Sequence, residues 1–213
     1  ESHRRAAAAI AEGRFRSQTL GIELKTRKGV TVFDTDEHVR ADATLENMAK
    51  LKPVFAKENG TVTPGNASGI NDGAAALVLM EAKAAQARGL KPMARLVAYA
   101  HAGVDPEYMG IGPVPATRKA LEKAGLKASD LDVIEANEAF AAQALAVTKD
   151  LGLDPAKVNP NGSGISIGHP VGATGALITV KAVYELERIQ GRYALVTMCI
   201  GGGQGIAAIF ERV

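Results

Sequence analysis

Three side chains that can move protons or bind a carbonyl group stand beside glycine-rich segments: Asn137, His169 and Cys199. His169 lies in residues 159–175, where glycines alternate with apolar residues, and Cys199 begins the run Cys-Ile-Gly-Gly-Gly. Imidazole accepts protons near neutral pH, and a thiol can be reactive. Glycine lets backbone N–H groups approach a ligand closely, and such groups stabilise charge on a carbonyl oxygen. We therefore expect a substrate to be held beside His169.

Each of these residues also has a purely structural interpretation. Asn137 directly precedes a predicted helix and could be its N-cap. His169 precedes a proline and could be only a turn residue, while Cys199 could be a small buried hydrophobic residue. Two observations favour function: residues 201–203 contain more glycine than a hairpin turn needs, and Asn137 and Cys199 each follow a predicted strand. Because ligands bind at the carboxyl ends of strands in open α/β sheets, Asn137 and Cys199 could line the same binding site.

The elements that must position these side chains alternate between strands and helices after Gly69. Apolar runs predict strands at 74–80, 94–100, 132–136, 193–198 and 205–210. Helices are predicted at 81–88, 114–124, 139–151 and 173–189. Glycines join the last two strands, which predicts an antiparallel hairpin. We expect an α/β fold with a mixed five-stranded sheet, ordered β-α-β-α-β-α-β-β, and helices on both faces.

The sequence before residue 66 is less regular. Residues 2–12 predict an alanine-rich helix that ends at Gly13. The stretch up to Gly65 contains only short alternating pieces, such as 29–33, and a short predicted helix at 45–50. An irregular connection of this length is typical of a segment with a function of its own. We therefore predict two parts of the chain, 1–65 and 66–213. The chain starts with Glu rather than Met, which indicates a piece of a longer protein.

Composition argues against several classes of protein. With 213 residues, 46% of them hydrophobic, the chain can bury a sizeable core. Its 25 Lys and Arg against 23 Asp and Glu give no reason to expect a nucleic-acid partner. No stretch approaches the roughly 20 apolar residues that span a bilayer, so we expect no membrane association and a cytoplasmic location. One cysteine allows neither a disulfide nor a cysteine metal site, and no metal is expected. The glycines at 201–205 lead into a strand rather than a helix, unlike a dinucleotide-binding fingerprint.

Four ordered blocks resemble the thiolase family, and within it the bacterial β-ketothiolases (acetyl-CoA acyltransferases). They are Asn-Ala-Ser-Gly-Ile-Asn-Asp-Gly-Ala at 66–74, Asn-Glu-Ala-Phe at 137–140, Gly-His-Pro-Val-Gly-Ala-Thr-Gly at 168–175 and Cys-Ile-Gly-Gly-Gly at 199–203. The resemblance covers essentially the whole chain and implies the C-terminal half of a thiolase. Thiolases have two similar α/β halves stacked in five layers, αβαβα, with a loop domain in the first half, to whose end residues 1–65 would belong. The nucleophilic cysteine belongs to that first half, and its Cys-Gly-Ser-Gly type motif is missing from this sequence.

The resemblance implies a role for each site residue. His169 would activate the nucleophilic cysteine, and Cys199 would be the acid/base for the α-proton of the acetyl thioester. Asn137 would hold a water that binds the enolate oxygen together with His169, and the N–H of Gly201 would contribute to a second oxyanion site. Contacts with coenzyme A or the acyl group are implied for Ser68, Arg40, Phe55, Met109, Ala139 and Phe140. Arg40 could equally be a solvated arginine.

The implied reaction is a reversible Claisen condensation or thiolysis between acetyl-CoA and acyl-CoA, which gives 3-ketoacyl-CoA and free CoA through an acyl-cysteine. No cofactor is implied, since the coenzyme A thioesters are substrates. The implied partners are the N-terminal half with its cysteine and further copies in a homodimer or homotetramer. Related ketoacyl synthases usually have a histidine where Cys199 stands. The alternative is a non-catalytic CoA-binding or packing module, which lacks the nucleophile and leaves an apolar face unpaired.

Overall fold

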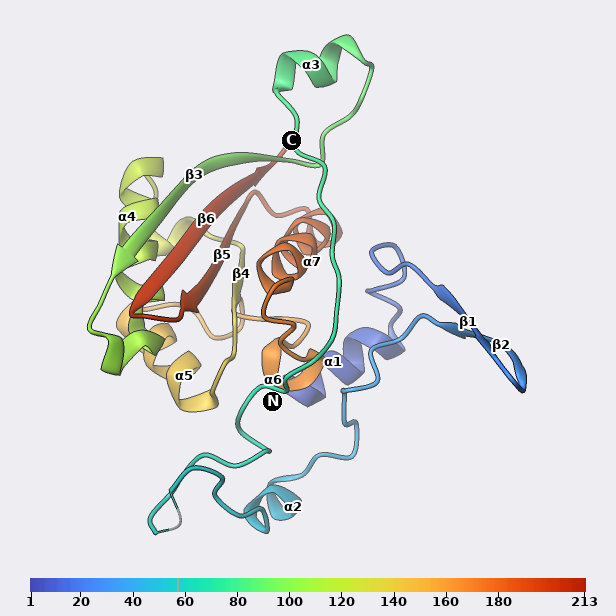
Figure 1. Cartoon of the computed structure of the whole chain (residues 1–213). Coiled ribbons are helices and arrows are strands. Elements are labelled where there is room, and N and C mark those ends of the chain that lie inside the picture. The colour runs from blue at the N-terminus through green and yellow to red at the C-terminus, as the bar shows by residue number, and fades with distance from the viewer. Residues whose placement is uncertain (57) are drawn as a thin grey trace.

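A mixed four-stranded sheet forms the centre of the protein, which the computed structural model describes at residues 1–56 and 58–213. The strands are β3 (Ala94–Gly103), β4 (Val133–Ala136), β5 (Tyr193–Ile200) and β6 (Gln204–Arg212) (Figure 1). Their order in the sheet is β3-β6-β5-β4. β4 and β5 are parallel, while β6 is antiparallel to both β3 and β5. The predicted α/β class and the predicted C-terminal hairpin are therefore confirmed.

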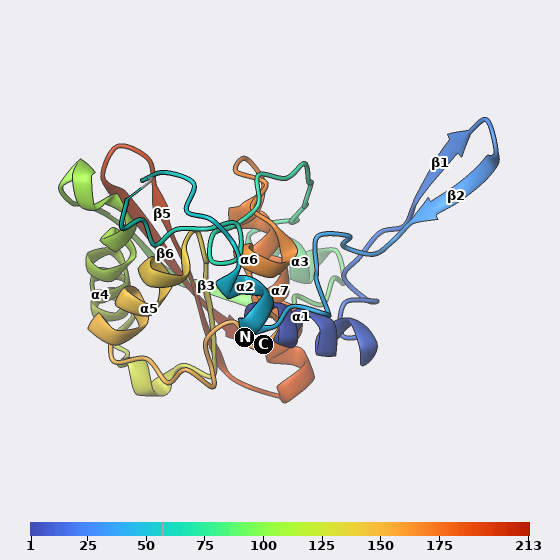
Figure 2. The same cartoon turned by 90° about the horizontal axis from the view of Figure 1, so that it is seen from below.

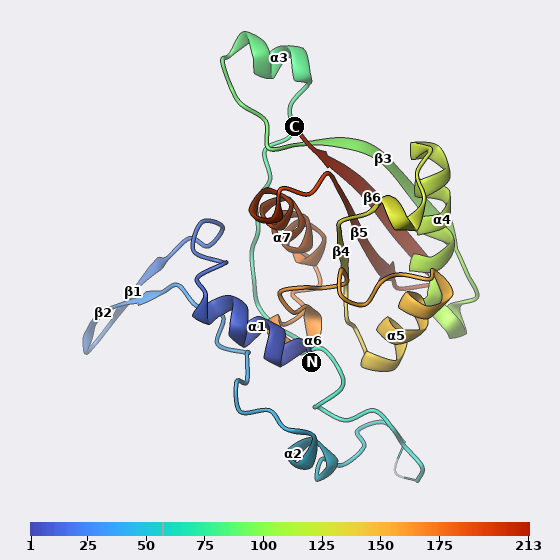
Figure 3. The ribbon, with the colours of Figure 1, turned by 180° about the vertical axis from the view of Figure 1, so that it is seen from behind.

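Helices cover both faces of this sheet, as Figure 3 shows from behind. α4 (Pro113–Ala124) and α5 (Ala141–Asp150) lie on one side, and α7 (Thr174–Ile189) lies on the other. Under α4, Ala116 and Ala120 pack with Leu195 and Ile209. Under α7, the core consists of Val133, Ile178, Ala182, Leu186, Ala194 and Val196. Alternate residues of β4 thus enter opposite layers, because side chains of a strand alternate between its faces.

The remaining elements are short or lie outside the sheet. Short helices are α2 (Leu45–Ala49), α3 (Ala82–Ala87), η1 (Pro106–Ile111), η2 (Ala128–Asp130) and α6 (Gly164–Ile167). α1 (Ser2–Ala11) packs against α6, and the Ser2 hydroxyl donates to Glu138 Oε2 at 2.5 Å. β1 (Ile22–Thr26) and β2 (Gly29–Phe33) form an antiparallel hairpin that projects from the body (Figure 2). Every residue of this hairpin is exposed.

The predicted strand at 74–80 is wrong, and the sheet of the described residues has four strands instead of five. The segment is extended and runs past α7 (Figure 1). Its side chains are far from buried: Val78 is 91% exposed and Leu79 is 73% exposed. The apolar composition suits a buried strand, but a strand also needs a neighbour for its backbone N–H and C=O groups. No described strand pairs with this segment.

Candidate active site

The carboxyl ends of β4 and β5 bring Asn137 and Cys199 to the same edge of the sheet. Ala136 is opposite Thr197 in the parallel pair, and the N–H of Asn137 donates to the Thr197 carbonyl at 3.0 Å. Cys199 follows two residues later on β5. Asn137 is 2% exposed and Cys199 is 8% exposed. The sheet therefore holds a buried amide and a buried thiol where α/β proteins bind ligands.

His169 joins this edge from the loop between α6 and α7. Its Nε2 lies 3.4 Å from Nδ2 of Asn137, and its Nδ1 lies 2.7 Å from Oγ1 of Thr174. The backbone N–H of His169 donates to Oδ1 of Asn71 at 3.2 Å. Burial lowers the pKa of His169, because a half-buried ring is less able to carry charge. The imidazole is thus neutral near pH 7 and can accept a proton.

The glycines around His169 make room for side chains of this protein. Gly168 has a φ of 104°, and a methyl group there would overlap Asn71. A Cβ on Gly164 would lie 2.9 Å from Oδ1 of Asn137. Gly172, by contrast, has open space around it. At Gly164 and Gly168, the close approach that we expected for a substrate is therefore made by two asparagine side chains of this protein.

Asn137 does not cap α5, so its structural interpretation is wrong. The N-cap residue is Phe140, and no side chain caps this helix end. Oδ1 of Asn137 is buried and has no hydrogen-bond partner in the described part of the chain. Buried amide oxygens nearly always have a partner, so this atom marks a place where a bound group can be held.

The turn between β5 and β6 explains two of its three glycines. Gly202 and Gly203 have φ values of 83° and 86°, which side-chain-bearing residues rarely adopt. A methyl group on Gly203 would also overlap the carbonyl of Val104. Gly201 does not have a positive φ, and a methyl group on it would meet no atom within 4 Å. The turn therefore does not require glycine at 201. Gly201 is exposed, so a ligand can reach its backbone.

Cys199 is a free thiol beside that turn. Burial raises the pKa of Cys199, because the thiolate is poorly solvated there. The thiol is therefore protonated near pH 7, and its thiolate is a stronger base than that of an exposed cysteine. Burial alone would also fit a core residue, so the role of Cys199 as an acid/base stays a prediction.

Four of the six residues implied at the substrate lie together. The N–H of Ser68 donates to the Ala139 carbonyl at 2.9 Å, and Ala67 pairs with Phe140 in an antiparallel bridge. The rings of Phe55 and Phe140 meet edge to face with centroids 6.4 Å apart.

Met109 and Arg40 are placed differently. Met109 lies in η1, which Gln143 of α5 holds through a 3.1 Å hydrogen bond to the Gly110 carbonyl. Arg40 is exposed, and its backbone N–H donates to Nδ1 of His3 at 3.1 Å. No hydrogen bond or aromatic contact among the described residues joins Arg40 to the Ser68–Phe140 cluster.

Three residues that hold the site had no assigned role in the sequence: Asn71, Thr174 and Asn159. The Asn159 amide accepts from the Ala136 N–H at 2.9 Å and donates to the Ala136 carbonyl at 2.8 Å. It thereby fixes the backbone immediately before Asn137. Asn71 and Thr174 lie in motif blocks, and Asn159 begins the glycine-rich segment 159–175. Only the folded contacts distinguish them from ordinary turn and cap residues.

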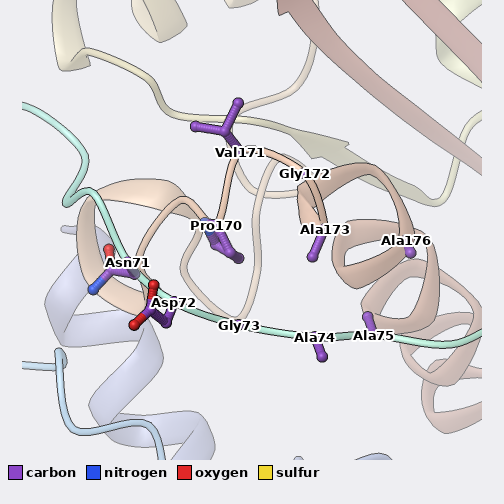
Figure 4. Close-up of a pocket in the computed structure, with 10 residues that line it drawn as sticks. All are labelled: Asn71, Asp72, Gly73, Ala74, Ala75, Pro170, Val171, Gly172, Ala173 and Ala176. Atoms are coloured by element: carbon purple, nitrogen blue, oxygen red, sulfur yellow. The ribbon is translucent and has the colours of Figure 1, made fainter.

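A groove of about 490 Å³ lies beside the His169 loop (Figure 4). One wall is the extended segment 71–75, and the other consists of residues 170–173 and Ala176. Pro170 faces the extended segment, and Asn71 and Asp72 stand at one end. Most of the lining side chains are small, so the groove can receive a closely packed piece of polypeptide.

Metal-binding clusters and membrane spans are both absent from residues 1–56 and 58–213. These residues contain no group of three or more His, Cys, Asp or Glu side chains that could hold a metal ion. No helix in the same ranges is long and apolar enough to cross a membrane.

The sequence matches family models for both thiolase domains. The thiolase N-terminal domain matches residues 1–83, and the thiolase C-terminal domain matches residues 90–212. The chain belongs to the thiolase family. The family predicted from the four motif blocks is therefore confirmed, while our division of the chain at residue 65 stays a prediction.

Individual relatives agree with this assignment. The β-ketothiolase BktB of Cupriavidus necator is 76% identical over 213 residues, which are 100% of this chain and 54% of that protein. The acetyl-CoA acetyltransferase of Paracoccus denitrificans is 54% identical over 211 residues, 99% of this chain and 54% of that protein. The chain thus spans about half the length of the curated relatives it matches.

Solved structures show the same fold. The acetyl-CoA acetyltransferase of Bacillus anthracis has a TM-score of 0.96 and 53% identity, and the match covers 100% of this chain and 54% of that one. Human mitochondrial 3-ketoacyl-CoA thiolase in complex with CoA has a TM-score of 0.90 and 44% identity, with 100% and 52% covered.

Proposed function

We propose that this chain supplies one side of a thiolase active site for reversible Claisen condensation or thiolysis between acetyl-CoA and acyl-CoA. The observation that carries the proposal is the contact of Asn137 with His169 at the sheet edge where Cys199 lies one residue before the end of β5. Membership of the thiolase family supports it, as do relatives named β-ketothiolase and acetyl-CoA acetyltransferase.

In the first step, His169 would activate a cysteine supplied by the other half of the enzyme. Nε2 takes the thiol proton, and the resulting thiolate attacks the thioester carbonyl. The new carbon–sulfur bond displaces the CoA thiolate, which takes a proton from the Cys199 thiol, or from water where that thiol is absent. Cys199 is then a thiolate, and the imidazolium of His169 keeps its proton on Nε2. The lowered pKa of His169 supports this role, because a neutral ring is needed to accept the proton.

In the second step, the Cys199 thiolate would remove a proton from the α-carbon of acetyl-CoA. A raised pKa makes this thiolate a stronger base for a weakly acidic carbon. The enolate oxygen would be bound by His169 and by a water on Asn137, whose unpartnered Oδ1 supports the presence of a bound group. The enolate carbon then attacks the acyl-cysteine carbonyl and breaks its carbon–sulfur bond, which releases 3-ketoacyl-CoA. The cysteine thiolate that leaves takes its proton back from the imidazolium of His169. The exposed backbone of Gly201 would contribute an N–H to a second oxyanion site.

Coenzyme A thioesters would be substrates, and we propose that no cofactor takes part. The cluster of Ser68, Phe55, Ala139 and Phe140 is a suitable surface for the pantetheine and acyl parts. Met109 of η1 would line the acyl end of the pocket. The exposed Arg40 side chain is free to meet a phosphate, although its position apart from this cluster makes it the weakest of these assignments.

The principal partner that we propose is the N-terminal thiolase half that carries the nucleophilic cysteine. Both the groove beside His169 and the exposed segment 77–80 could be covered by that half. The exposed apolar side chains of the β1–β2 hairpin, among them Leu24 and Val32, favour association of further copies in a homodimer or homotetramer. A single cysteine without a disulfide is typical of a reducing compartment such as the cytoplasm.

The alternative is a non-catalytic CoA-binding or packing module, which the exposed apolar segment at 77–80 also fits. Cleavage of acetoacetyl-CoA by CoA distinguishes the two. We expect no cleavage by the chain alone and measurable cleavage after co-production with a first thiolase half that carries the cysteine. A soluble complex of the two halves without cleavage would favour the module.

Two variants in that complex assign the chemical steps. His169→Ala should slow acylation by about 10²- to 10⁴-fold, the usual contribution of a general base. Cys199→Ala should suppress exchange of the acetyl α-protons while acylation continues. Unchanged acylation in His169→Ala, or lost acylation with retained exchange in Cys199→Ala, would contradict these roles.

A further inference from the structure

The side of His169 that faces away from Asn137 is held by a buried hydroxyl. Thr174 is 1% exposed and lies in the first turn of α7, five residues after His169. Its Oγ1 is 2.7 Å from Nδ1 of His169 and 2.9 Å from the carbonyl oxygen of Pro170. One hydroxyl thus connects the imidazole ring to the helix that follows it.

The hydrogen positions of this contact follow from which of the groups can donate and which can accept. Threonine hydroxyls in helices commonly donate to the carbonyl four residues earlier, and Pro170 stands in that position. A hydroxyl has a single proton, so Oγ1 of Thr174 then offers a lone pair to the imidazole. Nδ1 of His169 must therefore carry the hydrogen.

The opposite nitrogen is consistent with this assignment. In the neutral ring, a proton on Nδ1 leaves a lone pair on Nε2. Among the described residues, the polar contact of Nε2 is with Nδ2 of Asn137, a donor, at 3.4 Å. This contact is long, so the lone pair of Nε2 stays available to another proton donor.

We propose that Thr174 is a positioning residue, which holds His169 in the tautomer with hydrogen on Nδ1 and leaves Nε2 free to accept the proton of the nucleophile. This inference rests on the proposed thiolase function for its purpose, whereas the tautomer itself is a property of this chain alone. The hydrogen bond made by one ring nitrogen of a histidine commonly sets the protonation of the other nitrogen in this way.

The tautomer can be measured by NMR on the chain labelled with ¹⁵N-histidine. The sequence has four histidines, and the His169→Gln variant identifies the signals of His169. We expect a protonated Nδ1 and a lone-pair Nε2 in the unaltered chain and in Thr174→Ser, which keeps the hydroxyl. Thr174→Val keeps the shape of the side chain but removes the hydroxyl, and should give a mixture of tautomers.

A matched control lies one turn further along the same helix. Thr179 is 8% exposed and donates to the Gly175 carbonyl at 2.7 Å, so it makes the same backbone contact without touching His169. Thr179→Val should leave the signals of His169 unchanged. A proton on Nε2 in the unaltered chain, or an unchanged tautomer in Thr174→Val, would overturn the proposal.

Kinetics of the two-half complex provides a separate readout. Thr174→Val should lower the acylation kcat by about tenfold to a hundredfold, with little change in KM. Loss of the hydrogen-bond partner of a metal-ligating histidine has an effect of this size. Thr174→Ser should restore most of the rate. If the unaltered complex shows no activity while NMR finds the expected tautomer, the proposed function fails and the tautomer assignment stands. An acylation rate unaffected by Thr174→Val would remove Thr174 from the mechanism.

Discussion

Removal of the buried lysine Lys181 should destabilise the fold in a way that depends on pH. Lys181 of α7 is 4% exposed, and its Nζ lies 2.7 Å from Oε2 of Glu135 on β4, which is fully buried. The ammonium also donates to the Gly162 carbonyl at 2.5 Å. It thus joins α7, β4 and the loop before His169 at one point. Breaking a buried pair by removing one partner costs about 3–5 kcal/mol when the remaining group is charged, and protonation of Glu135 lessens this cost.

The pH dependence follows from the remaining carboxyl group. Burial raises the pKa of Glu135 from 4.5 to about 7, and Lys181 opposes this rise. Because of the raised pKa, Glu135 holds a proton in the folded state at pH values where the unfolded state has lost it. The contribution of Glu135 to the free energy of unfolding therefore falls as pH rises from 4.5 to about 7. Without Lys181 the pKa rises further. The variant Lys181→Met should then keep losing about 1.4 kcal/mol per pH unit above pH 7, where the unaltered chain does not.

The assay is urea unfolding followed by circular dichroism at about pH 6, 7 and 8. The difference in unfolding free energy between Lys181→Met and the unaltered chain should grow between about pH 7 and 8. The double variant Glu135→Gln, Lys181→Met should remove that growth, since no carboxyl group remains to titrate. Lys50→Met is the surface control: its pair with Glu46 is exposed at both ends, so its loss should cost less than about 1 kcal/mol. A cost for Lys181→Met no larger than for Lys50→Met, or one that is independent of pH, would refute this reasoning.

Two further predictions concern the β5–β6 turn. Gly203→Ala should lower the unfolding free energy by about 2 kcal/mol or more, because the residue has a φ of 86° and a methyl group would overlap the Val104 carbonyl, whereas Gly201→Ala should change it little. Equal losses in urea unfolding would contradict this distinction. Cys199 should react with iodoacetamide at pH 8 at least about tenfold more slowly than a model thiol, since burial and a raised pKa both reduce the accessible thiolate. A rate equal to that of the model thiol would show that the strand end is open.

The motif residues could be recognised in the sequence because their chemistry is local. His169 in a glycine-rich loop, Asn137 after an apolar run and Cys199 before three glycines each combine a reactive type with a backbone signal. The ends of helices could be predicted for the same reason. Gly125, for example, ends α4 in the left-handed conformation that glycine favours. These features identified the family and located most of the elements before any contact was known.

The strand predicted at 74–80 shows where sequence was insufficient. An apolar run indicates that a segment is buried in the folded protein. A strand also needs a neighbouring strand for its backbone hydrogen bonds, and which strands pair depends on the tertiary structure. The sequence of residues 71–81 contains no information on whether that neighbour is present. The segment therefore appears in the structure as an extended, largely exposed stretch beside α7.

The sequence by itself determined which residue types are available for catalysis and that no nucleophilic motif of the Cys-Gly-Ser-Gly type is among them. Only the tertiary structure decided how they are held. Asn71, Asn159 and Thr174 fix the backbone or the ring of the catalytic candidates through contacts of 2.7 to 3.2 Å. Two of these partners are distant along the chain from the residue they hold, because hydrogen bonds depend on proximity in space, which sequence order does not specify.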